Sequence, residues 1–265
     1  MTTQHLDVNG GRIAYDEQGP ADGRLVLCLH GLGDTRRIHR FLAPRLAAAG
    51  YRVVTSDMRG CGESSAEFTD YSPDAVGADT VALLRHLGRP AILIGHSYTG
   101  ASAVWAATEA PDLVHGLVLL DSFVRDAKMN PVVALLAKLI SRSAALWAMY
   151  YKTLYPVRKP ADFAAYVAEL KASLRQPGHL AALTAMMGGS RADSAARVSR
   201  VACPALVVMG AKDSDFPDPA AEARWIADTL GGPARVEMID GAGHYPMADS
   251  VDTTADVITA FLKEV

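Results

Sequence analysis

Hydrophobic residues occur along this chain of 265 residues in two patterns, short continuous runs and longer segments in which they recur every three or four positions. Continuous runs are typical of strands buried on both faces of a parallel sheet, whereas the wider spacing is typical of amphipathic helices. Strands are predicted at residues 25–29, 51–56, 91–94, 116–121, 205–210 and 235–239. Because helical patterns alternate with these strands, we expect an α/β protein.

The first residues follow a third pattern, in which apolar and polar side chains alternate. Residues 4–8 and 12–16 alternate in this way on either side of Asn9-Gly10-Gly11. A glycine-rich turn between two alternating segments predicts an antiparallel hairpin. Together with the buried runs, the hairpin gives a predicted sheet of eight strands that is mostly parallel and flanked by helices.

The alternation of strands and helices stops between residues 123 and 200, where we find no convincing strand pattern. Helices are predicted there at residues 132–151, 161–174 and 179–187. We interpret residues 123–200 as a helical cap, inserted after the sixth strand into a core formed by residues 1–122 and 201–265. Apolar cap side chains that could line a pocket are Leu135, Leu139, Leu146, Trp147, Tyr150, Phe163, Met186 and Met187.

Composition and charge narrow the possible partners. The formal net charge is -3 at pH 7, which predicts neither a nucleic-acid nor a membrane partner. The longest apolar stretch, 132–151, carries Lys138 and Arg142 on one helical face, which favours an amphipathic helix over a membrane span. The three cysteines are scattered, and no apolar leader pattern begins the chain. We therefore expect a cytoplasmic protein with no disulfide and no bound metal.

Ser97 lies where a predicted strand turns directly into a predicted helix. Gly95-His96-Ser97 follows the apolar run 91–94 and precedes a helical pattern at 101–110. A serine in such a sharp turn is exposed above the sheet edge, beside free backbone N–H groups. Thr99 stands where a glycine would let the helix approach the strand closely, although Gly100 follows it. Taken alone, the tripeptide fits an ordinary turn as well as a nucleophile.

Further polar residues follow the ends of the other predicted strands. Asp121 ends one run, Asp213 and Asp215 follow the next, and His244 lies in a glycine-flanked loop after the last. The carboxyl ends of parallel strands meet at one edge of a sheet, so these side chains are expected to converge with Ser97. Asp213 is the favoured acid to orient the histidine, with Asp215 and Asp121 as alternatives.

A glycine-rich loop follows the first buried run. Its residues are His30-Gly31-Leu32-Gly33, and the glycines on either side of Leu32 leave room for its N–H to point outward. Such an N–H is what an oxyanion hole requires. The Leu32 amide is therefore one predicted donor to a developing oxyanion.

Taken together, these segments resemble the α/β-hydrolase superfamily over nearly the whole chain. The matching segments are His30-Gly31-Leu32-Gly33, Asp57-Met58-Arg59-Gly60-Cys61-Gly62-Glu63-Ser64, the turn at Ser97, Gly210-Ala211-Lys212-Asp213 and Gly241-Ala242-Gly243-His244. The resemblance implies the α/β-hydrolase fold, with Ser97 as nucleophile, His244 as general base and Asp213 as its partner. It also implies that the backbone amides of Leu32 and Tyr98 form the oxyanion hole.

The expected activity follows from this set of residues. Epoxide hydrolases and haloalkane dehalogenases resemble the same layout but carry an aspartate at the position of Ser97, so acyl transfer to water is favoured here. We expect a serine hydrolase that cleaves a small, largely apolar carboxylic ester or lactone through an acyl-enzyme intermediate, with no cofactor. The alternatives are a cofactor-free lyase or oxygenase and a ligand-binding sensor on the same scaffold. Expected substrate contacts are His30, Gly31, His96, Trp147, Tyr150, Met186 and Tyr245.

Overall fold

A computed structural model describes residues 2–126 and 130–265, and a single sheet of eight strands lies at its centre. The strands are β1 (Gln4–Val8), β2 (Gly11–Gln18), β3 (Leu25–Leu29), β4 (Arg52–Ser56), β5 (Ala91–His96), β6 (Val114–Leu120), β7 (Ala205–Gly210) and β8 (Ala234–Ile239). They lie in the order β1-β2-β4-β3-β5-β6-β7-β8. The β1–β2 and β2–β4 pairs are antiparallel and the other pairs are parallel, which confirms the predicted mostly parallel sheet.

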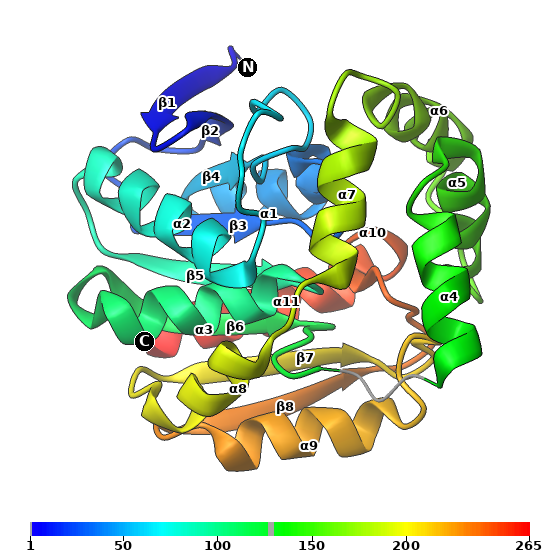
Figure 1. Cartoon of the computed structure of the whole chain (residues 1–265). Coiled ribbons are helices and arrows are strands. Elements are labelled where there is room, and N and C mark those ends of the chain that lie inside the picture. The colour runs from blue at the N-terminus through cyan, green and yellow to red at the C-terminus, as the bar shows by residue number, and fades with distance from the viewer. Residues whose placement is uncertain (1, 127–129) are drawn as a thin grey trace.

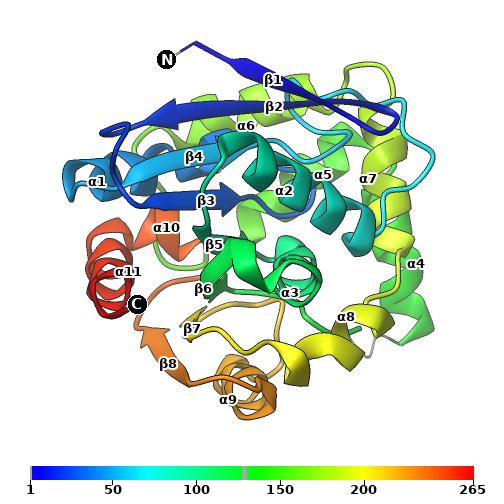
Figure 2. The ribbon, with the colours of Figure 1, turned by 90° about the vertical axis from the view of Figure 1, so that its left-hand side faces the viewer.

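Helices cover both faces of this sheet (Figures 1 and 2). The α-helices are α1 (Leu42–Ala48), α2 (Pro73–Leu87), α3 (Thr99–Glu109), α4 (Pro131–Ile140), α5 (Ala144–Thr153), α6 (Phe163–Ser173), α7 (His179–Gly188), α8 (Ala192–Arg197), α9 (Pro219–Thr229), α10 (Pro246–Asp249) and α11 (Val251–Glu264). Helices α1 and α11 lie on one face, and α2, α3 and α9 lie on the other (Figure 2).

The central strands are continuous apolar runs because both of their faces are buried. In β3, Leu25, Leu27 and Leu29 pack into one hydrophobic cluster, and Val26 and Cys28 pack into the other. Successive side chains of a strand point to opposite faces, so each run supplies both clusters. The burial of these side chains fixes the register of the strands and therefore the place where each strand ends.

The helices that follow β6 lie beyond the carboxyl ends of the central strands (Figure 1). Helices α4 to α7 form this layer, whereas α8 packs against α3, and the Ser194 hydroxyl donates to the Ala101 carbonyl at 3.1 Å. The division into a core and a cap of residues 123–200 stays a prediction. Among the described residues, no single helix is long and apolar enough to cross a bilayer, although α4 and α5 together have the length and composition.

The prediction of one helix over residues 132–151 is wrong. The chain forms α4 and α5 instead, and their axes differ in direction by 119°. The Ser141 hydroxyl donates to the Lys138 carbonyl, and the Ser143 hydroxyl accepts from the Leu146 N–H, which caps the start of α5. Serine side chains that bond to the backbone in this way favour helix ends over helix interiors.

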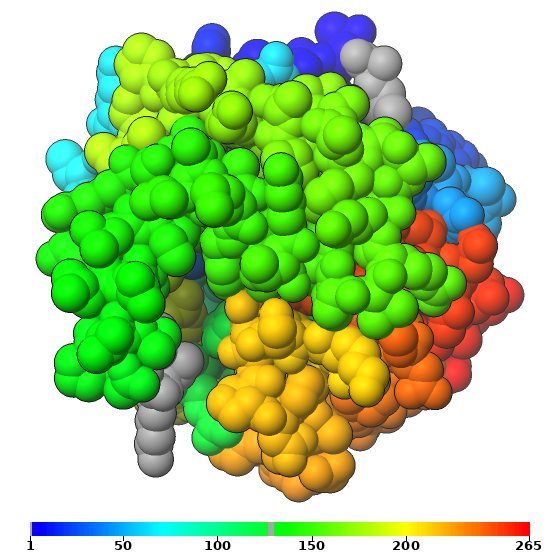
Figure 3. Space-filling model, turned by 90° about the vertical axis from the view of Figure 1, so that its right-hand side faces the viewer, coloured from blue at the N-terminus to red at the C-terminus, as the bar shows by residue number. Residues whose placement is uncertain are grey.

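The apolar side chains of α4, which were candidates to line a pocket, are largely exposed. No residue of α4 is buried, and Leu135 and Leu139 are 59% and 48% exposed. Leu146, in α5, is 42% exposed. These three side chains therefore do not line an enclosed pocket. Figure 3 shows this face of the molecule, where a hollow lies between α4, in green, and the yellow to orange surface of residues 211–229, which include α9.

Candidate active site

Ser97 occupies the turn between β5 and α3, with a φ of 53°. Among the described residues that are not glycine, Asp121 alone shares such a left-handed backbone. This conformation costs roughly 1–3 kcal/mol, so neighbouring bonds must hold it. The Ser97 N–H donates to the Leu120 carbonyl at 3.0 Å, and the Ser97 carbonyl accepts from the amides of Gly100 and Phe123.

Two glycines and one threonine allow this turn to be tight. A Cβ at Gly95 would lie 2.8 Å from the Thr99 carbonyl oxygen, and one at Gly100 would lie 2.4 Å from the Ser122 Cβ. Helix α3 therefore approaches Ser122 closely at Gly100, whereas the side chain of Thr99 does not permit a close approach at its own position. The Thr99 hydroxyl accepts from the His96 N–H at 3.0 Å, so its side chain closes the turn.

The loop after β3 lies directly against Ser97. A Cβ at Gly31 would lie 2.8 Å from the Ser97 Cβ, so a side chain at this position is excluded. Within residues 2–126 and 130–265, the backbone amides of Leu32 and Tyr98 donate to no protein acceptor. These are the two N–H groups that the sequence predicts for an oxyanion hole, and they are free to bind an oxygen from a ligand.

His30 holds this loop in place. Its Nδ1 donates to the Gly31 carbonyl at 2.8 Å, and its Nε2 accepts from the Met58 N–H at 3.0 Å. Burial lowers the pKa of His30 to about 4, which keeps the imidazole neutral and able to make both bonds. With both ring nitrogens bonded to the backbone, His30 positions the loop, and its side chain is fully buried.

His244 and Asp213 form a buried pair, and the backbone of His244 is hydrogen-bonded to His96, the residue before Ser97. The His244 Nδ1 lies 2.7 Å from the Asp213 Oδ2, and the other Asp213 oxygen accepts from the Asp215 N–H at 2.9 Å. Burial alone would lower the pKa of His244, but the charge and hydrogen bond of Asp213 outweigh it and raise that pKa. This hydrogen bond fixes the tautomer that leaves the His244 Nε2 free for proton transfer.

His96 links the Ser97 turn to the His244 loop. Its Nε2 donates to the His244 carbonyl at 2.8 Å, and the two imidazole rings lie 5.0 Å apart. Burial holds the pKa of His96 well below its ordinary value, so the ring is neutral. The Tyr245 ring stacks on the Tyr155 ring and lies 4.9 Å from the His96 ring. The two tyrosine side chains therefore pack next to His96.

Three expected substrate contacts lie on the inserted helices. Trp147 covers the loop after β3, because a Cβ at Gly33 would lie 2.5 Å from its indole ring. The Tyr150 hydroxyl donates to the Asp215 carboxylate at 2.7 Å. Met186 is fully buried in a cluster with Tyr98, the residue after Ser97.

The sequence analysis did not identify two aromatic residues beside His244. Phe123 and Phe216 stack with their ring centroids 4.4 Å apart, and these centroids lie 6.1 and 6.4 Å from the His244 ring. Each residue follows the end of a central strand, β6 or β7, closely. Their place just beyond a strand end was the signal that could have identified them.

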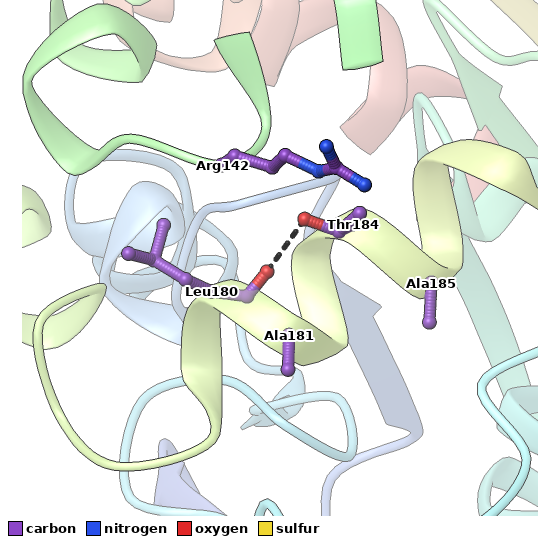
Figure 4. A pocket seen from close by; sticks show the side chains of 5 residues that line it. All are labelled: Arg142, Leu180, Ala181, Thr184 and Ala185. Carbon is purple, nitrogen blue, oxygen red and sulfur yellow. Dashed lines mark hydrogen bonds between the residues drawn. The ribbon is translucent and has the colours of Figure 1, made fainter. Parts of the chain in front are cut away.

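A cavity of about 470 Å³ lies elsewhere on the inserted helices (Figure 4). Its lining residues are Arg142, Leu180, Ala181, Thr184 and Ala185. None of the predicted site residues contributes to this lining. The Thr184 hydroxyl donates to the Leu180 carbonyl at 2.8 Å, so this polar group is already bonded within α7.

Asp121 completes a cluster of potential ligand atoms with Asp213 and His244. One such atom from each residue lies within 4.8 Å of the others, and all three side chains are buried. The His244 Nδ1 and the Asp213 Oδ2, however, already share a hydrogen bond at 2.7 Å. A metal ion would have to displace that proton, so the donor set fits a hydrogen-bonded pair better than an ion.

Comparisons with known proteins agree with this fold. The model of a family described as "Alpha/beta hydrolase family" matches residues 26–257. The chain is 30% identical to 2-(acetamidomethylene)succinate hydrolase of Mesorhizobium japonicum, over 96% of this chain and 94% of that protein. It is 27% identical to a pimeloyl-[acyl-carrier protein] methyl ester esterase of Neisseria meningitidis, over 91% of this chain and 77% of that protein.

A solved structure resembles the fold over nearly its full length. The enol-lactonase from Burkholderia xenovorans LB400 superposes with a TM-score of 0.80 at 22% sequence identity. The superposition covers 98% of this chain and 100% of that structure. At this level of identity the likeness is evidence for the fold, and the identity of the substrate has to be argued from the site.

Proposed function

This chain belongs to the α/β-hydrolase family, and from that premise we propose that it is a serine hydrolase acting on a small, largely apolar carboxylic ester or lactone. The relatives include proteins named as a hydrolase, a methyl ester esterase and an enol-lactonase. The observation that carries the proposal is the buried His244–Asp213 pair, which His96 links to a serine in a strained turn with two free amides beside it.

The proposed mechanism assigns one step to each group. Ser97 attacks the acyl carbon while the His244 Nε2 takes its proton, and the amides of Leu32 and Tyr98 stabilise the oxyanion. His244 then returns the proton to the leaving oxygen, which departs and leaves an ester on Ser97. Water attacks this ester in a second round of the same proton transfers, which releases the acid and restores the serine.

Asp213 makes this proton transfer favourable by stabilising the imidazolium that forms. Its charge raises the pKa of His244 above the ordinary value of 6.5, and the neutral ring is the form that accepts the serine proton. Activity is therefore expected to rise with pH, through an apparent pKa above 6.5. The proposal also includes a cytoplasmic location, the absence of a cofactor and a cap of residues 123–200 that selects the substrate.

Ser97→Ala tests the proposal directly. It should lower kcat on an activated ester by on the order of 10⁴- to 10⁶-fold and abolish labelling by a fluorophosphonate. Ser102→Ala is the matched control, because the Ser102 hydroxyl is buried in α3 without a hydrogen-bond partner among the described residues. The control should keep both activity and labelling.

Two other outcomes would refute acyl transfer. Turnover that survives in Ser97→Ala, with no burst of product in the native protein, would favour a lyase or oxygenase that uses His244 as base. Stoichiometric binding of esters without turnover in the native protein would favour a ligand sensor.

A further inference from the structure

Asp121 lies at the end of β6, next to the turn that holds Ser97, and the mechanism above does not use it. Its side chain is fully buried, and its backbone has a φ of 43°. One carboxyl oxygen, Oδ1, accepts from the Gly210 N–H at 2.8 Å. The other, Oδ2, has no donor in the part of the chain that the structure describes. A buried carboxylate oxygen without a donor is costly, and a proton on that oxygen removes the cost.

The surroundings of Asp121 also favour its protonated form. Asp213 lies beside it and is paired with His244, and Asp215 lies 3.9 Å from the far nitrogen of that imidazole. His96, on the neighbouring strand, is neutral. Burial and the Asp213 charge raise the pKa of Asp121 well above its ordinary value, which favours the neutral acid.

We propose that Asp121 is a positioning residue, whose protonated carboxyl donates a hydrogen bond from Oδ2 to Asp213 and holds that carboxylate in line with the His244 Nδ1. The inference rests on the proposed function of Asp213 and His244. Asp213 then receives three donors, from the His244 ring, the Asp215 amide and Asp121. A carboxylate with its lone pairs occupied in this way has one orientation.

The neutral state of Asp121 has a second effect on the same site. An ionised Asp121 adds a negative charge beside His244 and raises the pKa of the imidazole, as Asp213 and Asp215 also do. Each increase in this pKa lowers the fraction of neutral imidazole that can accept the Ser97 proton at a given pH. A protonated Asp121 orients Asp213 without adding that charge.

The test uses two substitutions that separate orientation from charge. Asp121→Asn keeps an acceptor for the Gly210 amide and a donor for Asp213, and it is always neutral. We expect kcat/KM to stay within about threefold of the native value, with its acidic limb at the same pH. Asp121→Leu fills a similar volume without either bond, and should lower kcat by about 10- to 100-fold.

Two measurements on the resting protein make the result independent of turnover. The His244 imidazole, titrated by NMR, should have the same pKa in the native protein and in Asp121→Asn. The infrared difference spectrum between these two proteins at neutral pH should show the C=O stretch of a protonated carboxyl only in the native protein.

A different outcome of either measurement would overturn the inference. If Asp121 is ionised, Asp121→Asn removes a charge, so the His244 pKa falls and no protonated carboxyl band is lost. If the Leu variant folds, as judged by its thermal transition, and keeps native kcat, Asp121 has no positioning role. Because both spectra are recorded without substrate, they remain informative if Ser97→Ala refutes the proposed hydrolase.

Discussion

Ser97 and Asp121 each follow a central strand and each adopt a left-handed backbone without being glycine. Such a conformation costs free energy, and it persists because the bonds around it determine the chain path. Ser97 is held by Leu120 and Phe123, which flank Asp121 in the sequence, so the two turns support one another. At the scale of single residues, the site depends on backbone geometry as much as on side-chain chemistry.

The contact between Gly31 and Ser97 leads to a prediction at this scale. In Gly31→Ala the new methyl group would lie 2.8 Å from the Ser97 Cβ and 2.9 Å from the His96 Nδ1. We expect the loop to move, with kcat on an activated ester falling by at least about tenfold and stability by about 1–3 kcal/mol. Steady-state kinetics and urea unfolding measure the two effects.

A second glycine supplies the control for this substitution. A Cβ at Gly188 meets nothing within 4 Å, and the residue ends α7 without a positive φ. Gly188→Ala should leave kcat unchanged. Native kinetics in Gly31→Ala would show that activity does not require this loop to lie against Ser97.

At the scale of secondary structure elements, the strands could be predicted from the sequence and the inserted helices only in part. Burial on both faces makes each central strand a continuous apolar run. The end of that run determines where the polar residues that follow it lie. Helix α4 gives an apolar pattern as strong as that of a core helix, yet none of its residues is buried. Hydrophobic spacing predicts that a helix forms, but it does not specify which neighbour the helix packs against.

The loop after β3 is tied to the inserted helices through a buried acid. Asp34 accepts hydrogen bonds from the hydroxyls of Tyr151 and Tyr166 and from the Thr35 N–H. Burial outweighs these bonds and raises the pKa of Asp34 to about 6. No sequence pattern predicts this network, since its members come from three segments that are distant along the chain.

This raised pKa predicts how stability depends on pH. The folded state holds the Asp34 proton more tightly than the unfolded chain does, so Asp34 adds stability below its unfolded pKa of 3.8. That contribution is lost as pH rises through about 6, and it amounts to about 3 kcal/mol. In Asp34→Asn this side chain is neutral at every pH, so the contribution to stability should remain as pH rises.

Urea unfolding of both proteins between pH 4 and pH 7 checks this expectation. The difference in unfolding free energy, native minus Asp34→Asn, should fall over that range. A constant difference would mean that Asp34 is already ionised in the folded protein at pH 4.

At the scale of the whole molecule, the position of Ser97, Asp213 and His244 at one edge of the sheet was predictable because each follows a parallel strand. Parallel strands bring their carboxyl ends to one edge, whatever the separation along the chain. The contacts made by Trp147 and Tyr150 were not predictable in the same way. They depend on how one layer of helices packs over the sheet, and no local pattern encodes that packing.

Trp147 is a second contact, besides the Asp34 network, between these helices and the loop after β3. Its side chain is 2% exposed and packs directly over Gly33. Trp147→Ala should lower the free energy of unfolding by about 3–5 kcal/mol through the cavity it leaves. It should also lower kcat, because the Leu32 amide loses the packing that holds it.

Trp147→Phe is the matched variant, since it keeps an aromatic ring over the loop. It should recover most of the stability and most of the kcat. If Trp147→Ala destabilises the protein but leaves kcat at the native value, the helices add stability without organising the loop.

The Gly33–Trp147 contact also bears on how such proteins diverge. An alanine or serine at position 33 would collide with the indole ring, so a lineage that gains one there is expected to carry a smaller residue at position 147. Homologues with paired substitutions at these two positions are expected to differ in the distance between these helices and the loop after β3. The size of the opening through which a substrate enters would differ with that distance.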